Sequence, residues 1–255
     1  MESREIMIRV KGLTMGWGGT PIQEDLDFEV GRGEVFLILG GSGCGKSTLL
    51  RHLIGLEQPM AGEIEYPGLR GASPLSDRRG ELPRFGVMFQ SGALFGSMTL
   101  AQNVRLPLET WTDLDSRTIE DIVRWKLALV GLDGFENHLP AEISGGMKKR
   151  AAIARSLALE SELIFLDEPS AGLDPISAVE LDELIVTLGR DLGVTVVIVT
   201  HELASIFKVG TTCVMLDKAA RGIIARGDPR MLRDHASDPR VHSFFNRELL
   251  TMEDS

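Results

Sequence analysis

A glycine-rich stretch that follows a short apolar run constrains this chain more than any other feature. Residues 35–39 are apolar, as in a strand buried on both faces, and a helix is expected from Ser47 to about Gly55. The strand is followed by a stretch that extends into the helix and consists of Gly40, Gly41, Ser42, Gly43, Cys44, Gly45, Lys46, Ser47 and Thr48. The pattern is G-x-x-x-x-G-K followed by Ser or Thr, in which backbone N–H groups converge on phosphate oxygens. We expect Lys46 to contact the β- and γ-phosphates of a nucleoside triphosphate and Ser47 to ligate Mg²⁺.

The overall composition limits the class of protein. The 255 residues, 43% hydrophobic and 25% charged, suffice for one large soluble domain or for a core with a subdomain. The net charge of −10 disfavours nucleic acid as a partner, because phosphate neutralisation requires clustered Lys and Arg. The two cysteines, Cys44 and Cys213, lack metal-ligand or disulfide-framework spacing, which favours a reducing compartment. Since no apolar run approaches a membrane span, we expect a cytosolic protein or one peripheral to a membrane.

Alternation of apolar runs with helical patterns predicts the fold class. Residues 6–11 and 26–30 indicate two strands joined by a glycine-rich loop, and short strands are expected at 64–66 and 85–89, with a surface loop over 67–84. Residues 163–166 and 194–199 are continuous apolar strands, each followed by a helix. This order favours an α/β fold with a parallel, doubly wound sheet and ligands at the carboxyl ends of its strands. Helical spacing over residues 100–160 predicts a helical insertion.

An acidic pair ends the predicted strand 163–166. We expect Asp167 to hold Mg²⁺ through water and Glu168 to polarise the attacking water as general base. Acidic pairs at the surface end of a strand are common, so the neighbouring phosphate loop is what favours the catalytic interpretation.

Two further polar residues end predicted strands. His201 follows strand 194–199 and could contact a γ-phosphate or orient the water, although it could equally be a structural residue that opens a helix. Gln90 ends strand 85–89 and could ligate Mg²⁺ or sense the γ-phosphate, although taken alone a structural role is favoured.

Ser144, Gly145 and Gly146 precede a strong helix-forming run, residues 147–155. A serine and two glycines at a helix N-terminus form an anion site. The chain thus carries two phosphate sites but a single catalytic carboxylate pair. We therefore expect the second anion site to serve another copy of the protein.

The order of these motifs resembles the nucleotide-binding subunit of an ATP-binding cassette (ABC) transporter over nearly the whole chain. Residues 40–47 match the Walker A motif of that family, Gln90 the Q-loop, 144–147 the signature, 163–168 Walker B, 170–174 the D-loop and His201 the switch histidine. The resemblance implies a P-loop NTPase (RecA-like) parallel sheet core with an N-terminal antiparallel β subdomain and an inserted α-helical subdomain. Within one nucleotide-binding domain, 1–255, the expected parts are 1–90, 91–160, 161–235 and the tail 236–255.

The resemblance also implies an ATPase that binds ATP and Mg²⁺. The catalytic set would be Glu168, His201, Lys46 and Gln90, and the metal ligands Ser47, Gln90 and Asp167. Asp174 joins the residues expected to bind the nucleotide. Trp17, taken alone, is more typical of a partly buried anchor. It falls, however, where the family has an adenine-stacking aromatic, in place of the commoner tyrosine, so the resemblance favours stacking.

The implied partners are a second copy, packed head to tail around two ATP molecules, and integral membrane permease subunits. We expect the protein to be peripheral, at the cytoplasmic face of the inner membrane. Alternatives are an ABC importer subunit for a small polar solute and a non-transport ABC ATPase. A P-loop nucleotide kinase or switch would not need the second anion site.

Three details resemble the ATPase of Mla/Mce-type phospholipid transport systems. They are the sequence of residues 89–95, Met147 in place of the usual signature glutamine, and residues 238–241 of the tail. The resemblance implies phospholipid as the transported molecule, and a small accessory protein and a lipid-binding Mce-type protein as further partners.

Two apolar segments allow two interpretations each. Residues 94–98 could line a groove for a membrane subunit or pack inside the helical subdomain. In the tail, Val241, Phe244, Phe245, Leu249 and Leu250 share one helical face. Packing of this face on its own domain is favoured over docking on a second copy or an accessory protein.

Overall fold

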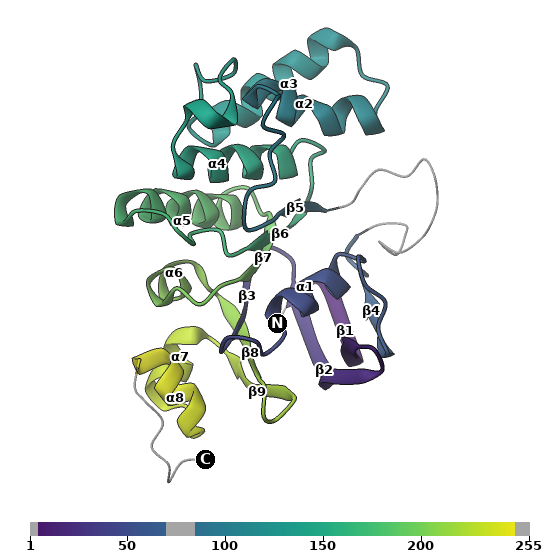
Figure 1. The fold of residues 1–255 in the computed structure, drawn as a ribbon, viewed down its shortest axis with the longest axis vertical. Coiled ribbons are helices and arrows are strands. Elements are labelled where there is room, and N and C mark those ends of the chain that lie inside the picture. Colours follow the sequence, from purple (N-terminus) through teal and green to yellow (C-terminus); the bar gives the residue numbers. More distant parts are fainter. Residues whose placement is uncertain (1–4, 70–84, 248–255) are drawn as a thin grey trace.

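A computed structural model of the chain describes residues 5–69 and 85–247. Its centre is a six-stranded sheet in which the first five strands in spatial order are parallel and the last is antiparallel. In that order the strands are β5 (Gly86–Met88), β6 (Leu163–Asp167), β7 (Thr195–Val199), β3 (Val35–Gly40), β8 (Thr212–Asp217) and β9 (Gly222–Gly227). The predicted parallel α/β core is confirmed, and Figure 1 shows it at the middle of the molecule.

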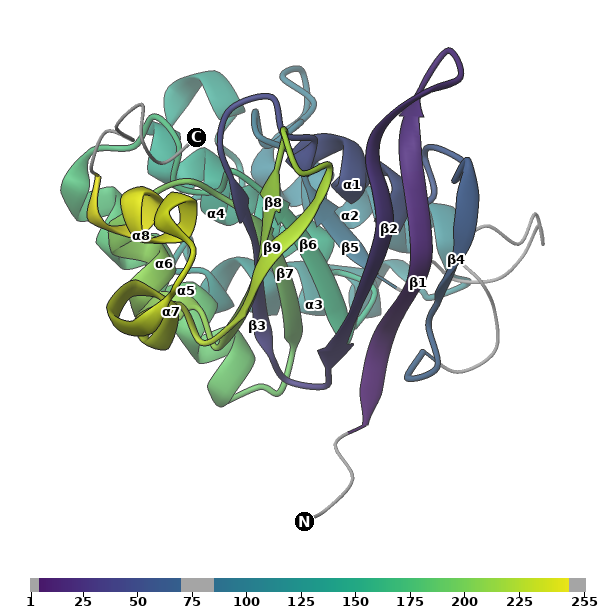
Figure 2. The ribbon, with the colours of Figure 1, turned by 90° about the horizontal axis from the view of Figure 1, so that it is seen from below.

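A second, antiparallel sheet lies beside the first. It contains β1 (Ile6–Trp17), β2 (Thr20–Gly31) and β4 (Ala61–Glu65), in the order β2-β1-β4. Seen from below, these strands stand on the opposite side of the central sheet from the C-terminal helices (Figure 2). The predicted N-terminal antiparallel subdomain is thus confirmed.

The connection between β1 and β2 is a tight hairpin turn, shorter than the glycine-rich loop that was predicted. Both strands are longer than predicted, and their connection is only Gly18–Gly19, each with positive φ. Gly16 belongs to β1, where a Cβ would lie 2.0 Å from the Thr20 carbonyl oxygen, so only glycine fits this close approach. Trp17 is the last residue of β1 rather than part of a loop. The register shifts between these strands interrupt the alternation by which a strand is predicted.

The central sheet has an apolar core on each face because its strands are buried on both sides. Phe36 and Ile38 pack with α1 (Lys46–Leu53) and with apolar side chains of the antiparallel sheet. Val35, Leu37 and Leu39 alternate with them and belong to the core on the helical side.

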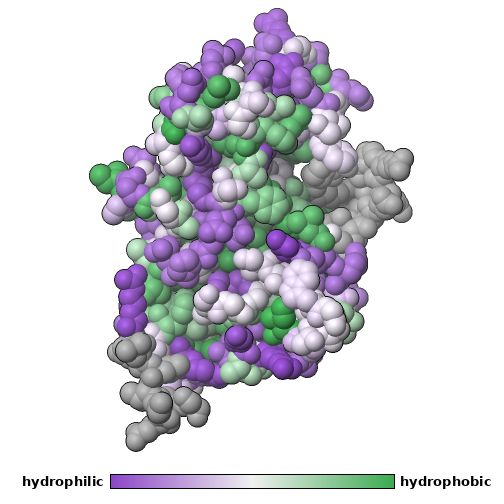
Figure 3. Space-filling view, viewed as in Figure 1, coloured by the Kyte–Doolittle hydropathy of each residue, from purple (hydrophilic) through white to green (hydrophobic). Residues whose placement is uncertain are grey.

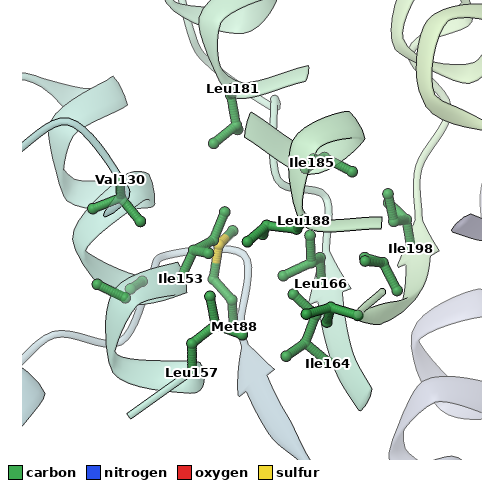
Figure 4. Close-up of a cluster of buried hydrophobic side chains, with 14 of the residues drawn as sticks. Met88, Val130, Ile153, Leu157, Ile164, Leu166, Leu181, Ile185, Leu188 and Ile198 are labelled. Atoms are coloured by element: carbon green, nitrogen blue, oxygen red, sulfur yellow. The ribbon is translucent and has the colours of Figure 1, made fainter. Parts of the chain in front are cut away.

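The helical insertion lies between β5 and β6, as predicted. It contains α2 (Leu100–Trp111), α3 (Ser116–Leu129), a short 3-10 helix (Pro140–Glu142) and α4 (Gly145–Ser156). Figure 4 shows Ile153 and Leu157, from α4 and its C-terminal end, beside Met88 of β5, and Ile164 of β6 belongs to the same cluster. Leu188 of α5 (Pro175–Arg190) packs in the same cluster. The insertion is therefore packed directly onto the strands that carry the predicted site residues.

The C-terminal part contains α6 (Leu203–Val209), α7 (Pro229–His235) and α8 (Pro239–Asn246). Val241 and Phe245 of α8 are buried, and the rings of Phe245 and Phe207 lie 5.7 Å apart. The favoured interpretation, packing of the tail on its own domain, is confirmed for these side chains. Leu249, Leu250 and most of the expected loop 67–84 lie outside the described residues.

The face of the molecule seen in Figure 3 is mixed in hydropathy. Polar and neutral side chains are interspersed with apolar groups over the face shown in Figure 3. Among the helices that the structure describes, none combines the length and apolar composition that a membrane crossing requires.

Candidate nucleotide site

The phosphate loop connects β3 to α1 in a conformation that only glycine permits at three points. Gly40, Gly43 and Gly45 have φ of 140°, 72° and 99°. Gly45 is the residue before α1, which begins at Lys46, one residue earlier than predicted. The Lys46 ammonium donates to the carbonyl oxygens of Gly40 and Gly41, at 2.9 and 3.0 Å. The cation is therefore held within the loop itself, where phosphate would meet it.

A buried side chain that is not among the predicted site residues holds the phosphate loop in place. Gln23 of β2 is fully buried, and its Nε2 donates to the carbonyl oxygens of Cys44, at 2.8 Å, and Asp217, at 2.9 Å. These bonds tie the loop to the end of β8, from a residue in the other sheet. A single glutamine in a strand does not allow such contacts to be predicted from the sequence.

Most of the residues predicted for the phosphate loop and the catalytic site line a hollow of about 530 Å³ at the carboxyl ends of the central strands, whereas Cys44 and Asp167 are not part of its lining. Its lining contains Ile22, Gly40, Gly41, Ser42, Gly43, Gly45, Lys46, Ser47, Thr48, Gln90, Glu168, His201 and Phe244. Ile22 and Phe244 were not among the predicted site residues. Phe244 comes from α8; its helical spacing predicted an apolar face but not which part of the molecule that face would meet.

Glu168 and His201 form a hydrogen-bonded pair at the edge of this hollow. Their Oε1 and Nδ1 atoms lie 2.8 Å apart, and the Glu168 side chain is largely buried whereas the His201 side chain is half-exposed. The Glu168 backbone has φ of 47°, outside the usual range for a side-chain-bearing residue, and its N–H donates to the Val199 carbonyl oxygen at 2.8 Å. An imidazole that fixes a carboxylate in this way is the arrangement that a positioned general base requires.

Asp167 has the environment of a cation ligand. Burial first, and then the charge of Glu168, raise the pKa of the Asp167 carboxyl. Its Oδ1 is buried and has no hydrogen-bond partner in the described part of the chain. A buried oxygen of this kind requires a proton or a cation, and carboxylate and hydroxyl oxygens are the ligands that Mg²⁺ prefers. The residues present therefore fit Mg²⁺.

The signature and the D-loop lie together, apart from the lining of the hollow. The Ser144 hydroxyl accepts from the Met147 N–H as the cap of α4, and a Cβ on Gly146 would lie 3.0 Å from that of Ser177. Asp174 caps α5 by accepting from Ile176 and Ser177 N–H groups. The structure thus places Ser144, Gly145, Gly146 and Asp174 away from the phosphate loop of their own chain.

Trp17 also lies outside the lining, at the end of β1, with its side chain half-exposed. Both an aromatic surface for a nucleobase and an anchor for the hairpin remain compatible with this position.

Comparison with known proteins decides the family. The model of the family described as ABC transporter matches residues 23–171, more than half of the chain. The chain belongs to the ABC transporter family. It is an ATPase of that family, which binds ATP and couples its hydrolysis to transport.

Relatives in the ABC transporter family match almost the whole chain. The probable ribonucleotide transport ATP-binding protein mkl of Mycobacterium leprae is 41% identical, over 94% of this chain and 69% of the relative. The intermembrane phospholipid transport system ATP-binding protein MlaF is 38% identical in Haemophilus influenzae, over 95% of this chain and 91% of the relative. MlaF of Escherichia coli strain K12 is 37% identical, over 94% and 88%.

Solved structures of ABC cassettes share the fold. A dimeric post-hydrolysis state of the cassette MJ0796, bound to ADP and Pi, matches with a TM-score of 0.74 and 27% identity, over 87% of this chain and 98% of that one. The cassette cbiO1 of Clostridium perfringens, part of the transporter complex cbiONQ, matches with a TM-score of 0.77 and 27% identity, over 95% and 99%.

The two interpretations of Trp17 make different predictions for ATP binding. If the ring stacks on adenine, Trp17→Ala will raise the Kd for ATP about tenfold, because base–aromatic stacking contributes roughly 1–3 kcal/mol. The Kd for inorganic tripolyphosphate, which has no base, will not change. Isothermal titration with both ligands measures this, with Trp17→Phe as the variant that keeps the ring. Equal weakening of both ligands would instead identify an anchor of the hairpin.

Proposed function

We propose that this chain is the ATPase subunit of a phospholipid transporter and works as a head-to-tail dimer at the cytoplasmic face of the inner membrane. The match to proteins named as phospholipid transport ATPases, over nearly the full length of both chains, carries the proposal. Integral membrane permeases, a small accessory protein and a lipid-binding Mce-type protein would complete the assembly. Such a cassette does not itself enclose the cargo, so the membrane and binding partners would select the transported molecule.

The second candidate is an ATPase for a small polar solute. It is favoured by the higher identity, 41%, to relatives named for ribonucleotide transport. These relatives are longer than this chain, which matches 67–69% of their length. The ATP chemistry is the same in both candidates.

The dimer follows from the separation of the two anion sites. Each ATP would contact the phosphate loop, Gln90, Asp167, Glu168 and His201 of one copy, and the N-terminus of α4, with Ser144, Gly145 and Gly146, of the other. The first turn of α4, at the signature, carries no acidic residue, and the similar cassette MJ0796 is itself dimeric.

In the proposed mechanism, Lys46 holds the β- and γ-phosphates and Glu168 accepts a proton from the attacking water. His201, bonded to Glu168 at 2.8 Å, keeps the carboxylate turned toward the phosphate. Asp167 and Ser47, with Gln90, would hold Mg²⁺, and the bound ion would neutralise part of the phosphate charge. ATP binding closes the dimer, and hydrolysis opens it.

The segment 94–98 presents an aromatic side chain, that of Phe95, outward, and we propose that this side chain contacts the permease. Leu94 packs against the core, whereas Phe95 is 51% exposed. Buried Asn103 fixes the segment, because its Oδ1 accepts from the Phe95 N–H at 2.8 Å and its Nδ2 donates to the Phe95 carbonyl oxygen at 3.1 Å. An exposed aromatic on a fixed backbone suits a docking contact.

Phe95→Asp is therefore expected to separate transport from ATP hydrolysis. The isolated protein should keep its ATPase rate within about twofold, because the side chain lies outside the hollow, while transport by the reconstituted complex falls at least about tenfold. Met231→Asp, at another exposed apolar position on α7, serves as the control. Unchanged transport in Phe95→Asp would assign the contact to another surface.

The test of the proposed function is isolation of the protein from gently solubilised membranes, followed by mass spectrometry of its partners and bound lipid. A multi-span permease, a lipid-binding protein and phospholipid are expected together. A permease with a solute-binding protein would favour the second candidate. Absence of any membrane partner would contradict both and favour a non-transport ABC ATPase.

A further inference from the structure

Lys149 is a buried cation behind the nucleotide hollow. It lies in the second turn of α4, the helix that begins at the signature, and only 7% of its surface is exposed. Neighbouring Lys148 is less buried. A basic run after the signature is typical of a solvated helix face, so the burial of one member requires an explanation.

The contacts of the Lys149 ammonium join two strand ends of the site. Its Nζ donates to the carbonyl oxygen of Gln90 and to that of Glu168, the latter at 3.3 Å. Gln90 follows β5 and Glu168 follows β6, and these two strands pair in parallel register. The side chains of both residues line the hollow. One ammonium therefore fixes the main chain of the predicted γ-phosphate sensor and of the predicted base.

A contribution to the stability of the fold does not by itself explain why an ammonium group is buried at position 149. Burial lowers the pKa of Lys149, while the charges of Asp167 and Glu168 raise it. Removing an ammonium from water is expensive, and apolar side chains of similar volume often serve a buried position equally well. The cation lies instead where α4, carrying the signature, meets the two loops that carry Gln90 and Glu168.

We propose that Lys149 is a positioning residue that links the two ATP sites of the dimer. The N-terminus of α4 would bind the ATP held by the other copy, and Lys149, on the same rigid helix, contacts the Gln90 and Glu168 main chains of its own site. A shift of α4 on binding moves both carbonyl groups. Glu168 has φ of 47°, a costly conformation that surrounding contacts must maintain, so a change in the contact with Lys149 acts on the main chain that carries the carboxylate. The proposal rests on the head-to-tail dimer of the proposed function.

The experiment compares Lys149→Met with wild type and with Lys149→Arg in the full chain. Measured are the Kd for ATP under non-hydrolysing conditions, kcat, KM and the Hill coefficient for ATP hydrolysis. Lys149→Met is expected to keep the Kd within about twofold, to lower kcat about tenfold and to reduce the Hill coefficient from about 2 towards 1. Lys149→Arg, which keeps the donor charge, should restore cooperativity in part. Lys148→Met is the matched control and should resemble wild type.

The Hill coefficient distinguishes a link between sites from a local role. A lower kcat with unchanged cooperativity would overturn the proposal and leave Lys149 as a local support of Glu168. Wild-type behaviour of Lys149→Met would also overturn it. If Lys149→Met fails to fold, Lys149→Gln, which keeps an N–H donor without the charge, is measured in the same way. A wild-type Hill coefficient of 1 without ATP-dependent dimers would contradict the dimer itself, which separates that failure from a failure of Lys149.

Discussion

Glu168→Gln is expected to bind ATP as tightly as the wild-type chain and to hydrolyse it at least about 100-fold more slowly. The amide cannot accept the proton of the attacking water, and positioned acid–base groups contribute roughly 10²–10⁴-fold in rate. Because the substitution is isosteric, the contact with His201 at 2.8 Å remains available. ATP should therefore accumulate in the closed dimer, which size-exclusion chromatography with Mg²⁺ and ATP detects together with a phosphate-release assay.

The matched control is Glu162→Gln, which makes the same change directly before β6, at its opposite end and on an exposed side chain. It should leave turnover unchanged. Near-normal turnover in Glu168→Gln would show that another group activates the water, and His201 would then be the first alternative to examine.

Gly40→Ala is expected to lower the stability of the folded chain by about 3 kcal/mol and to abolish measurable ATP binding. A Cβ at this position would lie 2.3 Å from the Leu216 carbonyl oxygen and 2.7 Å from Cys44 Sγ. Residue 40 also has φ of 140°, which side-chain-bearing residues rarely adopt. Backbone strain and overpacking contribute roughly 1–3 kcal/mol each, and they act at the base of the phosphate loop.

Thermal unfolding measures the first effect, and a decrease in Tm of about 10 °C is expected for a chain of this size. Gly41→Ala is the control for stability, because nothing lies within 4 Å of its Cβ position and its φ is outside the left-handed region. Equal Tm values for the two variants would show that the loop relaxes around the added methyl group.

The phosphate loop, the acidic pair and the signature could be predicted from the sequence because each is a contiguous pattern with a local mechanism. Gly45, Lys46 and Ser47 are consecutive, so they lie together at the junction of the loop and α1. Carboxyl ends of parallel strands lie at one edge of a sheet, so Gln90, Glu168 and His201 could be expected to meet, and the structure brings them into one hollow.

The remaining features depend on contacts between distant parts of the chain. Gln23 reaches a residue of β8, and Phe244 reaches the hollow from α8, neither of which local periodicity can indicate. Neither β8 nor β9 was predicted; in β9 none of the side chains is fully buried, and the strand carries two glycines. The burial of Lys149 depends on how α4 packs against β5. Its position in a basic run would instead predict a solvent-exposed side chain.

The thiol of Cys44 gives the phosphate loop a natural chemical reporter. It is 1% exposed, and burial raises its pKa, so the thiol is protonated and sheltered while the loop keeps its conformation. Alkylation at this position can follow only from opening of the loop, which a bound triphosphate opposes. The second thiol, Cys213, is fully buried in β8, where burial raises its pKa to about 12. The rate of thiol labelling of the unmodified chain therefore follows nucleotide occupancy, without an introduced probe.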